Sequence, residues 1–411
     1  MTDAELLAQP LTLPCGLVLK NRLAKSAMSE RLGTPDNHAT SGLATLYGRW
    51  ADGGLGLCIT GNVMIDRKAL GEPCNVALED DSGMAALDAW ARAGSRNSTS
   101  LWMQLNHPGR QVPRGLNVAS VSPSPVPFAP ALASVFATPR ELTEPEIEDL
   151  IARFGRSAGF AKQAGFAGVQ IHGAHGYLVS QFLSPHTNHR TDAWGGDAER
   201  RARFVVRVYE AMRAAVGPAF PLGIKLNSAD FQRGGFTEEE SLDVIDRLDG
   251  LAIDLIEVSG GTYEAPAMAG IRADSTRKRE AYFLDFADRV RARTKVPLMV
   301  TGGFRSAKGM AEALRSGALD LVGLARPLAI DPNFPNRLLA GEDVTSPVSP
   351  RRTGIKAIDR AAVLEVSWYE RQLGLMAAGH EPQPDENLLL AAAKIAVGSG
   401  WDLFRSRRTR A

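Results

Sequence analysis

Pro297-Leu-Met-Val-Thr-Gly-Gly303 is an apolar run that ends in two glycines, and Leu319-Asp-Leu-Val-Gly323 is a second run of the same kind. Nearly continuous apolar runs are typical of parallel strands that are covered on both faces. Between the two runs, Ser306 is suited to cap a helix that ends at Gly317. The stretch therefore predicts one strand–helix–strand unit of a βα repeat.

The same pattern recurs along the chain. The other strand-like runs are Leu23–Met28, Leu55–Thr60, Leu101–Leu105, Ala167–Ile171, Pro221–Leu226 and Leu255–Val258. Thr143 to Glu146 and Thr237 to Glu240 both match the capping-box pattern of a helix start. Eight such units, with no GxGxxG turn after the first or second run, favour an α/β fold of the (β/α)8 TIM barrel type over an open doubly wound sheet.

Two regions depart from the repeat. Residues 107–142 are rich in proline and serine, which indicates a lid or rim loop, or a surface excursion that does not contact substrate. Beyond Pro350, two helical stretches at about 355–378 and 387–404 precede an arginine-rich end, interpreted as a solvated tail. We therefore expect a barrel over residues 1–345 with an irregular rim insertion, and a C-terminal helical extension over 346–411.

Composition excludes several classes of function. The 47 basic and 46 acidic residues give a net charge of +1, which removes any electrostatic argument for nucleic acid or an anionic membrane surface as a partner. No apolar run is long enough to span a bilayer, and the N-terminus lacks the form of a secretory signal. The 3 cysteines include no CxxC pair, so neither a disulfide framework nor a zinc ribbon is expected. A cytoplasmic protein fits best.

In this kind of barrel, active-site residues lie where the strands end. The residues that close the runs are Ser26-Ala27-Met28-Ser29, Thr60-Gly61, Gln104, His172, Lys225, Ser259-Gly260-Gly261, Gly302-Gly303 and Ala325-Arg326. After the last two strands, the backbone N–H groups of Gly302-Gly303 and the guanidinium group of Arg326 suit a phosphate. The alternative is that the glycines serve only a tight turn.

A second cluster of polar residues starts at the end of the fourth strand. His172 and His175 can offer N–H donors to an oxygen that gathers negative charge, and Tyr177 can deliver a proton. The same HxxH spacing also occurs in metal sites, and ordinary polar packing is a third interpretation. Lys225 could be a Schiff-base nucleophile, as in aldolases, or a fixed positive charge beside a cofactor. Gln104 could bind the amide-like edge of a ring.

One long segment resembles a known family. His172-Gly-Ala-His-Gly-Tyr-Leu-Val-Ser-Gln-Phe-Leu-Ser-Pro185, continued by Asn188–Asp192 and Trp194–Gly196, is similar to the old yellow enzyme family of flavin-dependent ene-reductases. Leu17–Arg22, Met103–Leu105, Asp320–Gly323 and Ala325–Pro327 match that family in order and spacing. The resemblance covers residues 10–340 and argues against a metal at the two histidines.

The resemblance implies a barrel that binds FMN without a covalent bond and uses NADPH or NADH as reductant. The implied cofactor-binding residues are Ser26, Ala27, Met28 and Ser29 at the face and edge of the flavin, Gly61 and Gln104 at its pyrimidine side, Lys225 beside N1 and O2, and Gly302, Gly303, Ala325 and Arg326 at the phosphate. His172 and His175 would bind the carbonyl oxygen of the substrate, and Tyr177 would donate the proton.

Three positions depart from the family pattern. Ser29 stands where many members have a redox-tuning threonine or cysteine, Arg31 where some place a tyrosine, and Asn106 where yeast-type members have an aromatic residue. We expect Arg31 and Asn106 to contact the substrate and to affect its range. Because no cysteine follows Cys74, the cysteine cluster of the larger dienoyl-CoA reductase relatives is missing, which predicts a free-standing, FMN-only enzyme.

The predicted function is hydride transfer from NAD(P)H, through FMN, to the activated C=C bond of α,β-unsaturated carbonyl compounds. Two alternatives are an aldolase-type lyase that uses Lys225, and a non-catalytic flavin-binding or interaction protein. The expected partner is a small-molecule substrate, and the sequence leaves open whether the chain forms a homo-oligomer. No Rossmann fingerprint is present from which a preference for NADH or NADPH could be inferred.

Overall fold

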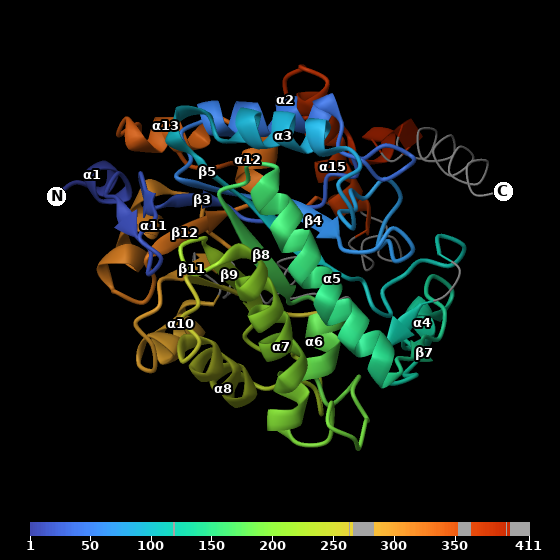
Figure 1. Cartoon of the computed structure of the whole chain (residues 1–411). Helices are drawn as coiled ribbons and strands as arrows, with labels where there is room; N and C mark the ends of the chain where they lie inside the picture. The colour runs from blue at the N-terminus through green and yellow to red at the C-terminus, as the bar shows by residue number, and fades with distance from the viewer. Residues whose placement is uncertain (118–119, 263, 266–282, 352–362, 392, 395–411) are drawn as a thin grey trace.

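The computed structural model describes residues 1–117, 120–262, 264–265, 283–351, 363–391 and 393–394. At its centre is a closed barrel of parallel strands in the order β10-β11-β12-β3-β4-β5-β8-β9 (Figure 1). These strands are β3 (Leu23–Lys25), β4 (Leu57–Met64), β5 (Ser100–Asn106), β8 (Gly168–Gly173), β9 (Leu222–Asn227), β10 (Leu255–Ser259), β11 (Leu298–Thr301) and β12 (Leu321–Leu324). The predicted (β/α)8 barrel is confirmed.

Helices surround the barrel (Figure 1). The longer ones are α2 (Ser41–Asp52), α3 (Met84–Gly94), α5 (Glu144–Gln163), α7 (Ala198–Val216), α8 (Glu238–Asp249), α10 (Leu284–Arg291) and α11 (Ala307–Arg315). The short ones are α1 (Asp3–Leu7), η1 (Arg96–Ser98), α4 (Pro130–Ala133), α6 (Leu178–Leu183), α12 (Arg326–Ile330) and α13 (Phe334–Leu339). Thr143 and Thr237 start α5 and α8 with capping boxes, and Ser306 caps α11, as the sequence predicts.

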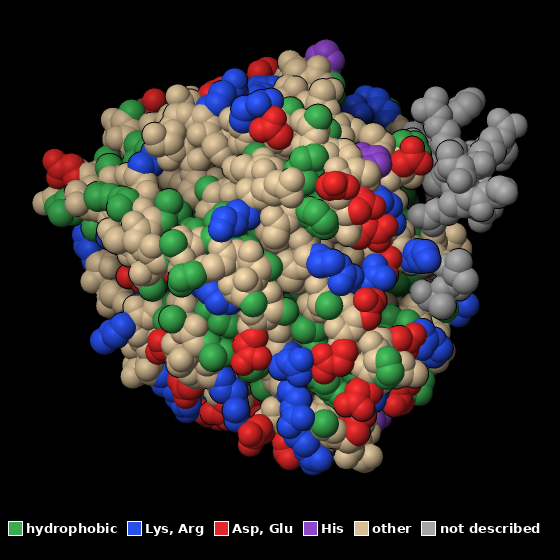
Figure 2. All heavy atoms as spheres, viewed as in Figure 1, with side chains coloured by type: hydrophobic (Ala, Val, Ile, Leu, Met, Phe, Trp, Pro, Cys, Tyr) green, Lys and Arg blue, Asp and Glu red, His purple; other side chains and the backbone are tan. Residues whose placement is uncertain are grey.

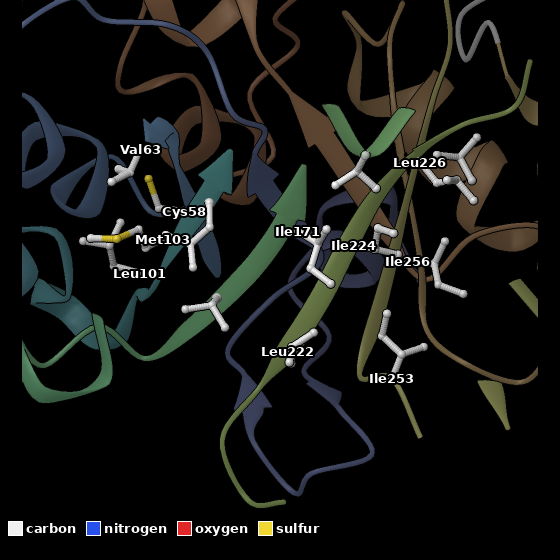
Figure 3. Close-up of a cluster of buried hydrophobic side chains, with 14 of the residues drawn as sticks. Cys58, Val63, Leu101, Met103, Ile171, Leu222, Ile224, Leu226, Ile253 and Ile256 are labelled. Carbon is white, nitrogen blue, oxygen red and sulfur yellow. The ribbon is translucent and has the colours of Figure 1, made fainter. Parts of the chain in front are cut away.

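Side chains of the barrel strands alternate between two environments, because successive side chains point to opposite faces of a sheet. In β9, Leu222, Ile224 and Leu226 face outward and pack in the large cluster beneath the helices (Figure 3). Between them, the side chain of Lys225 is buried and bonded to residues of other strands inside the barrel. The sequence shows continuous apolar runs because the inward positions are also largely apolar at the lower end of the barrel.

The lower interior is closed by apolar side chains. A hairpin of β1 (Leu11–Thr12) and β2 (Val18–Leu19) packs Leu11, Leu13 and Leu19 against inward residues of the barrel strands. Trp102 on β5 belongs to this layer, where its ring leaves no room for a Cβ on Gly168 of β8 or on Gly223 of β9. These two glycines are therefore required by close packing rather than by a turn.

The end of β4 differs from the prediction. The second run was expected to close at Thr60-Gly61, but β4 continues to Met64. Its pairing with β5 shifts register between Ile59 and Asn62, as expected for a β-bulge. The bulge places Gly61 beside the loop that follows β3, where a Cβ on Gly61 would meet the backbone oxygen of Met28 at 2.3 Å.

The two regions outside the repeat contain short ordered elements. Residues 107–142 include α4 and the strand pair β6 (Val121–Ser122) and β7 (Arg140–Glu141). In the C-terminal segment, α15 (Val363–Ala377) packs against α2 and α12, and residues 388–391 and 393–394 are helical. The rest of the two predicted helical stretches lies outside the described residues, as do the arginines Arg405, Arg407, Arg408 and Arg410.

Charged side chains of both signs are interspersed on the face of the molecule in Figure 2. Among the helices that the structure describes, none combines the length and the apolar character needed to cross a membrane.

Candidate active site

Polar side chains occupy the inward positions at the carboxyl ends of the strands, directly above the apolar layer. The sheet register places Gln104 beside Gln170, and it pairs Lys225 with His172 on one side and with Glu257 on the other. All five residues are buried. Four of the strands therefore bring their polar residues to one level of the barrel, at the end where this fold carries its chemistry.

Glu257 is the centre of this layer. Its Oε1 atom accepts hydrogen bonds from Ser26 Oγ at 2.5 Å and Thr301 Oγ1 at 2.8 Å, and it forms an ion pair with Lys225 Nζ at 3.0 Å. Its Oε2 atom accepts from Gln170 Nε2 at 2.8 Å, and Gln170 Oε1 in turn accepts from Gln104 Nε2 at 2.8 Å. Burial alone would raise the pKa of Glu257, but Lys225 and the donated hydrogen bonds hold that pKa below its usual value.

The histidines and the tyrosine form a second cluster next to this layer. The ring centroid of His172 lies 5.3 Å from that of His175 and 4.7 Å from that of Tyr177. His172 is the second-last residue of β8, whereas Tyr177 stands directly before α6. The structure therefore brings together the three side chains that the sequence singles out for catalysis.

The backbone of His175 is held in an unusual conformation. Its φ of 62° lies in the left-handed region, which a histidine rarely adopts. Asn227 Oδ1 accepts from the His175 N–H at 3.1 Å, and Gln111 Nε2 donates to the His175 carbonyl at 3.1 Å. The ring is fixed by a contact of 2.8 Å between Nε2 and Ser259 Oγ. Strain that is maintained by several neighbours is common at functional sites.

Both histidines of the cluster are neutral near pH 7. Burial lowers the pKa of His172 well below its usual value, and the neighbouring His175 and Lys225 lower it further. Burial and the charge of Lys225 also lower the pKa of His175 well below its usual value. Each ring therefore carries one N–H group. In His172, Nδ1 accepts from the Ala174 N–H at 3.4 Å, which places the ring proton on Nε2.

The loop after β3 connects the barrel to the C-terminal segment. Ala27 and Met28 are half-buried, and Ser29 Oγ donates to Glu72 Oε2. Arg31 forms an ion pair of 3.4 Å with Glu370 of α15. Burial and the nearby carboxylate of Glu72 raise the pKa of Glu370 to about 8, although Arg31 opposes this shift. Arg31 is thus held by an element outside the barrel repeat.

Asn106 lies at the end of β5 and is almost completely buried. Its Nδ2 faces the sulfur atom of Met64 at 3.9 Å, while its Oδ1 has no hydrogen-bond partner among the residues that the structure describes. A buried polar atom without a partner is costly, and it is a common sign of a bound molecule. Its position and its open acceptor fit a contact with a ligand.

Gly61, which the resemblance places at the pyrimidine side of the flavin, has hydrogen-bond partners within the protein. Its N–H group donates to Glu30 Oε1 and to the hydroxyl oxygen of Tyr47, each at 2.9 Å. Lys25 Nζ donates to Tyr47 and to the carbonyl of Ile59, at 3.3 and 2.8 Å. This fully buried group fastens the loop after β3 to the bulge of β4, and no sequence pattern indicated it.

The proposed phosphate residues lie after β11 and β12. Gly302 and Gly303 have φ values of 131° and 93°, a conformation that strongly favours glycine. Because glycine has no side chain, a ligand can approach the backbone N–H groups of these two residues closely. Ala325 immediately precedes α12, and Arg326 is its first residue. The guanidinium group of Arg326 contacts Glu365 of α15 at 3.4 Å.

The residues that the sequence analysis missed are Glu257, Gln170, Ser259 in its role at His175, and Glu30. The sequence does indicate that Glu257 is unusual, since it is the one acidic residue within the otherwise apolar run Leu255-Ile256-Glu257-Val258. A charged residue is rarely fully buried unless it is paired. One of the earlier alternatives also loses support, because Lys225 is engaged in an ion pair rather than free as an amine. Within the described ranges, no three His, Cys, Asp or Glu residues group as metal ligands.

The donor set fits FMN. The pyrimidine ring of a flavin presents carbonyl oxygens and an N–H group, which match the ammonium of Lys225 and the amide of Gln104. The bare backbone at Gly302-Gly303 and the guanidinium of Arg326 match a phosphate. The open acceptor of Asn106 adds a polar atom that a ligand can satisfy.

Comparisons with known proteins agree with this assignment. The family described as NADH:flavin oxidoreductase / NADH oxidase matches residues 7–343. The NADH-dependent flavin oxidoreductase iliE of Neonectria sp. (strain DH2) is 39% identical over 406 residues, which cover 90% of this chain and 51% of that protein. The NADH-dependent flavin oxidoreductase iccE of Talaromyces variabilis is 38% identical over 397 residues, which cover 90% of this chain and 94% of that protein. The chain thus spans about half the length of the first relative and nearly all of the second.

A solved structure shows the same fold. The old yellow enzyme homologue from Zymomonas mobilis superposes with a TM-score of 0.70 at 25% sequence identity, covering 83% of this chain and 94% of that one. The residues that match the family, 7–343, include every barrel strand described above. The chain therefore belongs to the NADH:flavin oxidoreductase / NADH oxidase family, the old yellow enzyme family that its motifs indicate, and it is an oxidoreductase with FMN as its cofactor.

Proposed function

We propose that this protein is an ene-reductase, which uses NADH or NADPH to reduce the activated C=C bond of α,β-unsaturated carbonyl compounds. The observation that carries the proposal is the cluster of His172, His175 and Tyr177 beside Lys225. FMN, when bound, would take a hydride from the nicotinamide and pass it to the β-carbon of the alkene. The relatives named NADH-dependent favour NADH as the reductant.

The two imidazoles would bind the carbonyl oxygen of the substrate. Because both rings are neutral, each can donate one N–H bond without placing a full positive charge in the buried site. Negative charge gathers on this oxygen as the alkene is reduced, and an oriented donor in such a site stabilises the transition state by roughly 3 kcal/mol. The strained backbone of His175 and its contact with Ser259 hold one of these donors in place before substrate arrives.

Tyr177 would hold the proton that the α-carbon receives. Its side chain is only 7% exposed, so bulk water has little access to it. Its ring lies 4.7 Å from that of His172, which places the phenol next to the group that would bind the carbonyl. A proton donor and an oxygen-binding donor on neighbouring side chains suit the two ends of an enone.

The test uses FMN-loaded protein under anaerobic conditions, with NADH as reductant and 2-cyclohexenone as substrate. We expect NADH to bleach the flavin and the enone to restore its colour. His172→Ala should lower turnover at least ~100-fold, because about 3 kcal/mol of stabilisation corresponds to that factor. His189→Ala is the matched control, since His189 is exposed and should leave turnover unchanged.

The outcomes separate the alternatives. A flavin that NADH bleaches but the enone does not reoxidise would contradict the ene-reductase proposal and leave a flavin oxidoreductase with another acceptor. A flavin that keeps its colour in NADH would indicate a non-catalytic carrier. Near-normal turnover in His172→Ala would remove that histidine from the mechanism.

A further inference from the structure

Glu257 is a fully buried carboxylate that the proposed reaction does not use directly, yet three proposed flavin-contact residues converge on it. Ser26 and Lys225 contact it directly, and Gln104 reaches it through Gln170. A carboxylate inside a protein is expensive to bury unless it is paired and hydrogen-bonded. Its placement at this level of the barrel therefore requires an explanation beyond packing.

The carboxylate fixes the direction of the hydrogen bonds around it. An ionised carboxylate has acceptors only, so Gln170 must present its Nε2 donor to Glu257. Gln170 Oε1 then faces Gln104 and accepts from its Nε2 atom. As a result, Gln104 keeps its Oε1 acceptor for a ring N–H. If position 257 could also donate, this chain of amides could reverse and Gln104 would present the opposite group.

The same carboxylate holds Lys225. The ammonium of Lys225 carries three N–H groups, of which one donates to Ser26 Oγ at 2.8 Å, and it forms an ion pair with Glu257 at 3.0 Å. Glu257 also offsets the positive charge of Lys225, which limits how strongly the lysine attracts negative charge nearby.

From these contacts we propose that Glu257 is a positioning residue with two effects on bound FMN: it sets the reduction potential through the charge of Lys225, and it secures binding of both redox forms by fixing the orientation of Gln104. The proposal rests on the placement of the flavin pyrimidine ring given above. Reduction adds electron density to that ring, so the net charge beside it determines how much more tightly the reduced form is bound than the oxidised form. A carboxylate in contact with the lysine makes reduction less favourable.

The experiment measures the midpoint potential of FMN-loaded protein by dye equilibration, together with the dissociation constant of FMN and the melting temperature. In Glu257→Gln, the affinity of the protein for reduced FMN, relative to its affinity for oxidised FMN, should rise at least tenfold. For a two-electron couple, this rise makes the midpoint potential of bound FMN about 30 mV more positive. Glu257→Asp retains the charge, so its ratio should remain within about threefold of the wild type. Recovery by the charge-retaining variant would not follow from a purely structural role.

The matched control is Asp254→Asn on the same segment of chain. Asp254 is a buried acid that precedes β10 and pairs with Arg213 at 2.7 Å, at the opposite end of the barrel from the polar layer. This variant should lower the melting temperature and leave the potential unchanged. An unchanged or more negative potential in loaded Glu257→Gln would overturn the proposal, as would an equal shift in Asp254→Asn.

A second variant keeps the proposal testable if Glu257→Gln does not fold. Gln170→Met interrupts the path to Gln104 but leaves the pair of Glu257 and Lys225 intact. FMN should then bind at least tenfold more weakly in both redox forms, while the potential changes little. Unchanged FMN affinity would contradict the orienting role of Glu257. These measurements need no enone, so a failure of the ene-reductase proposal would be recognised separately.

Discussion

The lower half of the barrel interior is filled by apolar side chains around Trp102, whereas the upper half, on the same strands, carries an ion pair and a chain of amides. On β5 the change occurs between Trp102 and Gln104, and on β10 between Leu255 and Glu257. In both strands the two residues face the same way, since their spacing is two. The backbone geometry is therefore shared, and side-chain chemistry alone separates a stabilising region from a functional one.

The two regions contribute to the free energy of folding in different ways. Apolar burial in the lower half is directly stabilising, at roughly 25 cal/mol per Å² removed from water. In the upper half, the desolvation of Glu257 and Lys225 offsets most of their attraction, so the pair adds little net stability. What the pair provides is a set of oriented donors and acceptors.

The largest effect is expected in the lower half. Trp102→Ala should reduce the free energy of unfolding by about 4 kcal/mol, because the ring is fully buried and Gly168 and Gly223 cannot fill the space it leaves. Urea unfolding followed by circular dichroism measures this loss. Gln104→Ala on the same strand should cost clearly less, and equal losses would mean that the two halves do not differ as described.

The contribution of the upper half to stability is tested by removing one partner of the ion pair between Lys225 and Glu257, and then by replacing both partners with apolar residues. Lys225→Met should lower the free energy of unfolding of the FMN-free protein by about 3 kcal/mol, because Glu257 is left buried without its counter-charge. Adding Glu257→Met should recover only part of that loss, since it removes the unpaired carboxylate but leaves the donors of Ser26, Gln170 and Thr301 without their acceptor. Unfolding curves of the two variants decide the matter, and a double variant less stable than Lys225→Met would show that the pair is itself stabilising.

The sequence was informative where one local signal determines one local structure. The capping boxes at Thr143 and Thr237 predicted the starts of α5 and α8 because the bonds that make a cap are confined to four residues. The ends of the strands similarly pointed to His172, Lys225 and Gln104, because a parallel barrel brings all strand ends to one edge.

The rest of the site depends on contacts that no local pattern contains. The rule that functional residues lie at strand ends does not indicate Glu257, because this residue is in the middle of β10, two positions before Ser259. The contact of Arg31 with Glu370 joins residues 339 positions apart, and the bulge that turns Gly61 toward Glu30 follows from the register of β4 against β5. Such pairings depend on the tertiary structure, on the packing of α15 against the barrel helices for Arg31 and on the register of neighbouring strands for Gly61.

The two histidines of the upper half should contribute to the pH dependence of stability. His172 and His175 have lowered pKa values in the folded state, so at these two positions the unfolded chain binds more protons than the folded one below about pH 6.5. Their contribution to the free energy of unfolding should therefore fall as the pH drops through that value, by at most ~1.4 kcal/mol per pH unit for each histidine, whereas Glu370, whose pKa is raised to about 8, contributes with the opposite sign. Urea titrations at a series of pH values measure the slope.

A third buried histidine contributes to the same slope. Burial lowers the pKa of His107 to about 4. The double variant His172→Asn and His175→Asn should therefore make stability fall less steeply as the pH drops below about 6.5, because it removes two of the three histidine contributions and leaves those of His107 and Glu370 in place. The exposed His189→Asn serves as control and should leave the slope unchanged. If the free energy of unfolding of the double variant depended on pH as steeply as that of the wild type, groups other than His172 and His175 would cause the dependence.

The smallest effects compare two inward residues of one strand. Thr301 donates to Glu257 Oε1 at 2.8 Å in the upper half, and Met299, two positions earlier, packs in the lower apolar layer. Thr301→Val keeps the shape but removes one hydrogen bond to a charged acceptor that retains its other donors, so it should cost about 1 kcal/mol. Met299→Leu conserves volume and should cost about the same or less. Thermal unfolding would show similar losses for both variants. A loss several times larger for Thr301→Val would mean that the polar layer is held together cooperatively, with each donor depending on the others, and that its hydrogen bonds stabilise the fold as much as the apolar layer does.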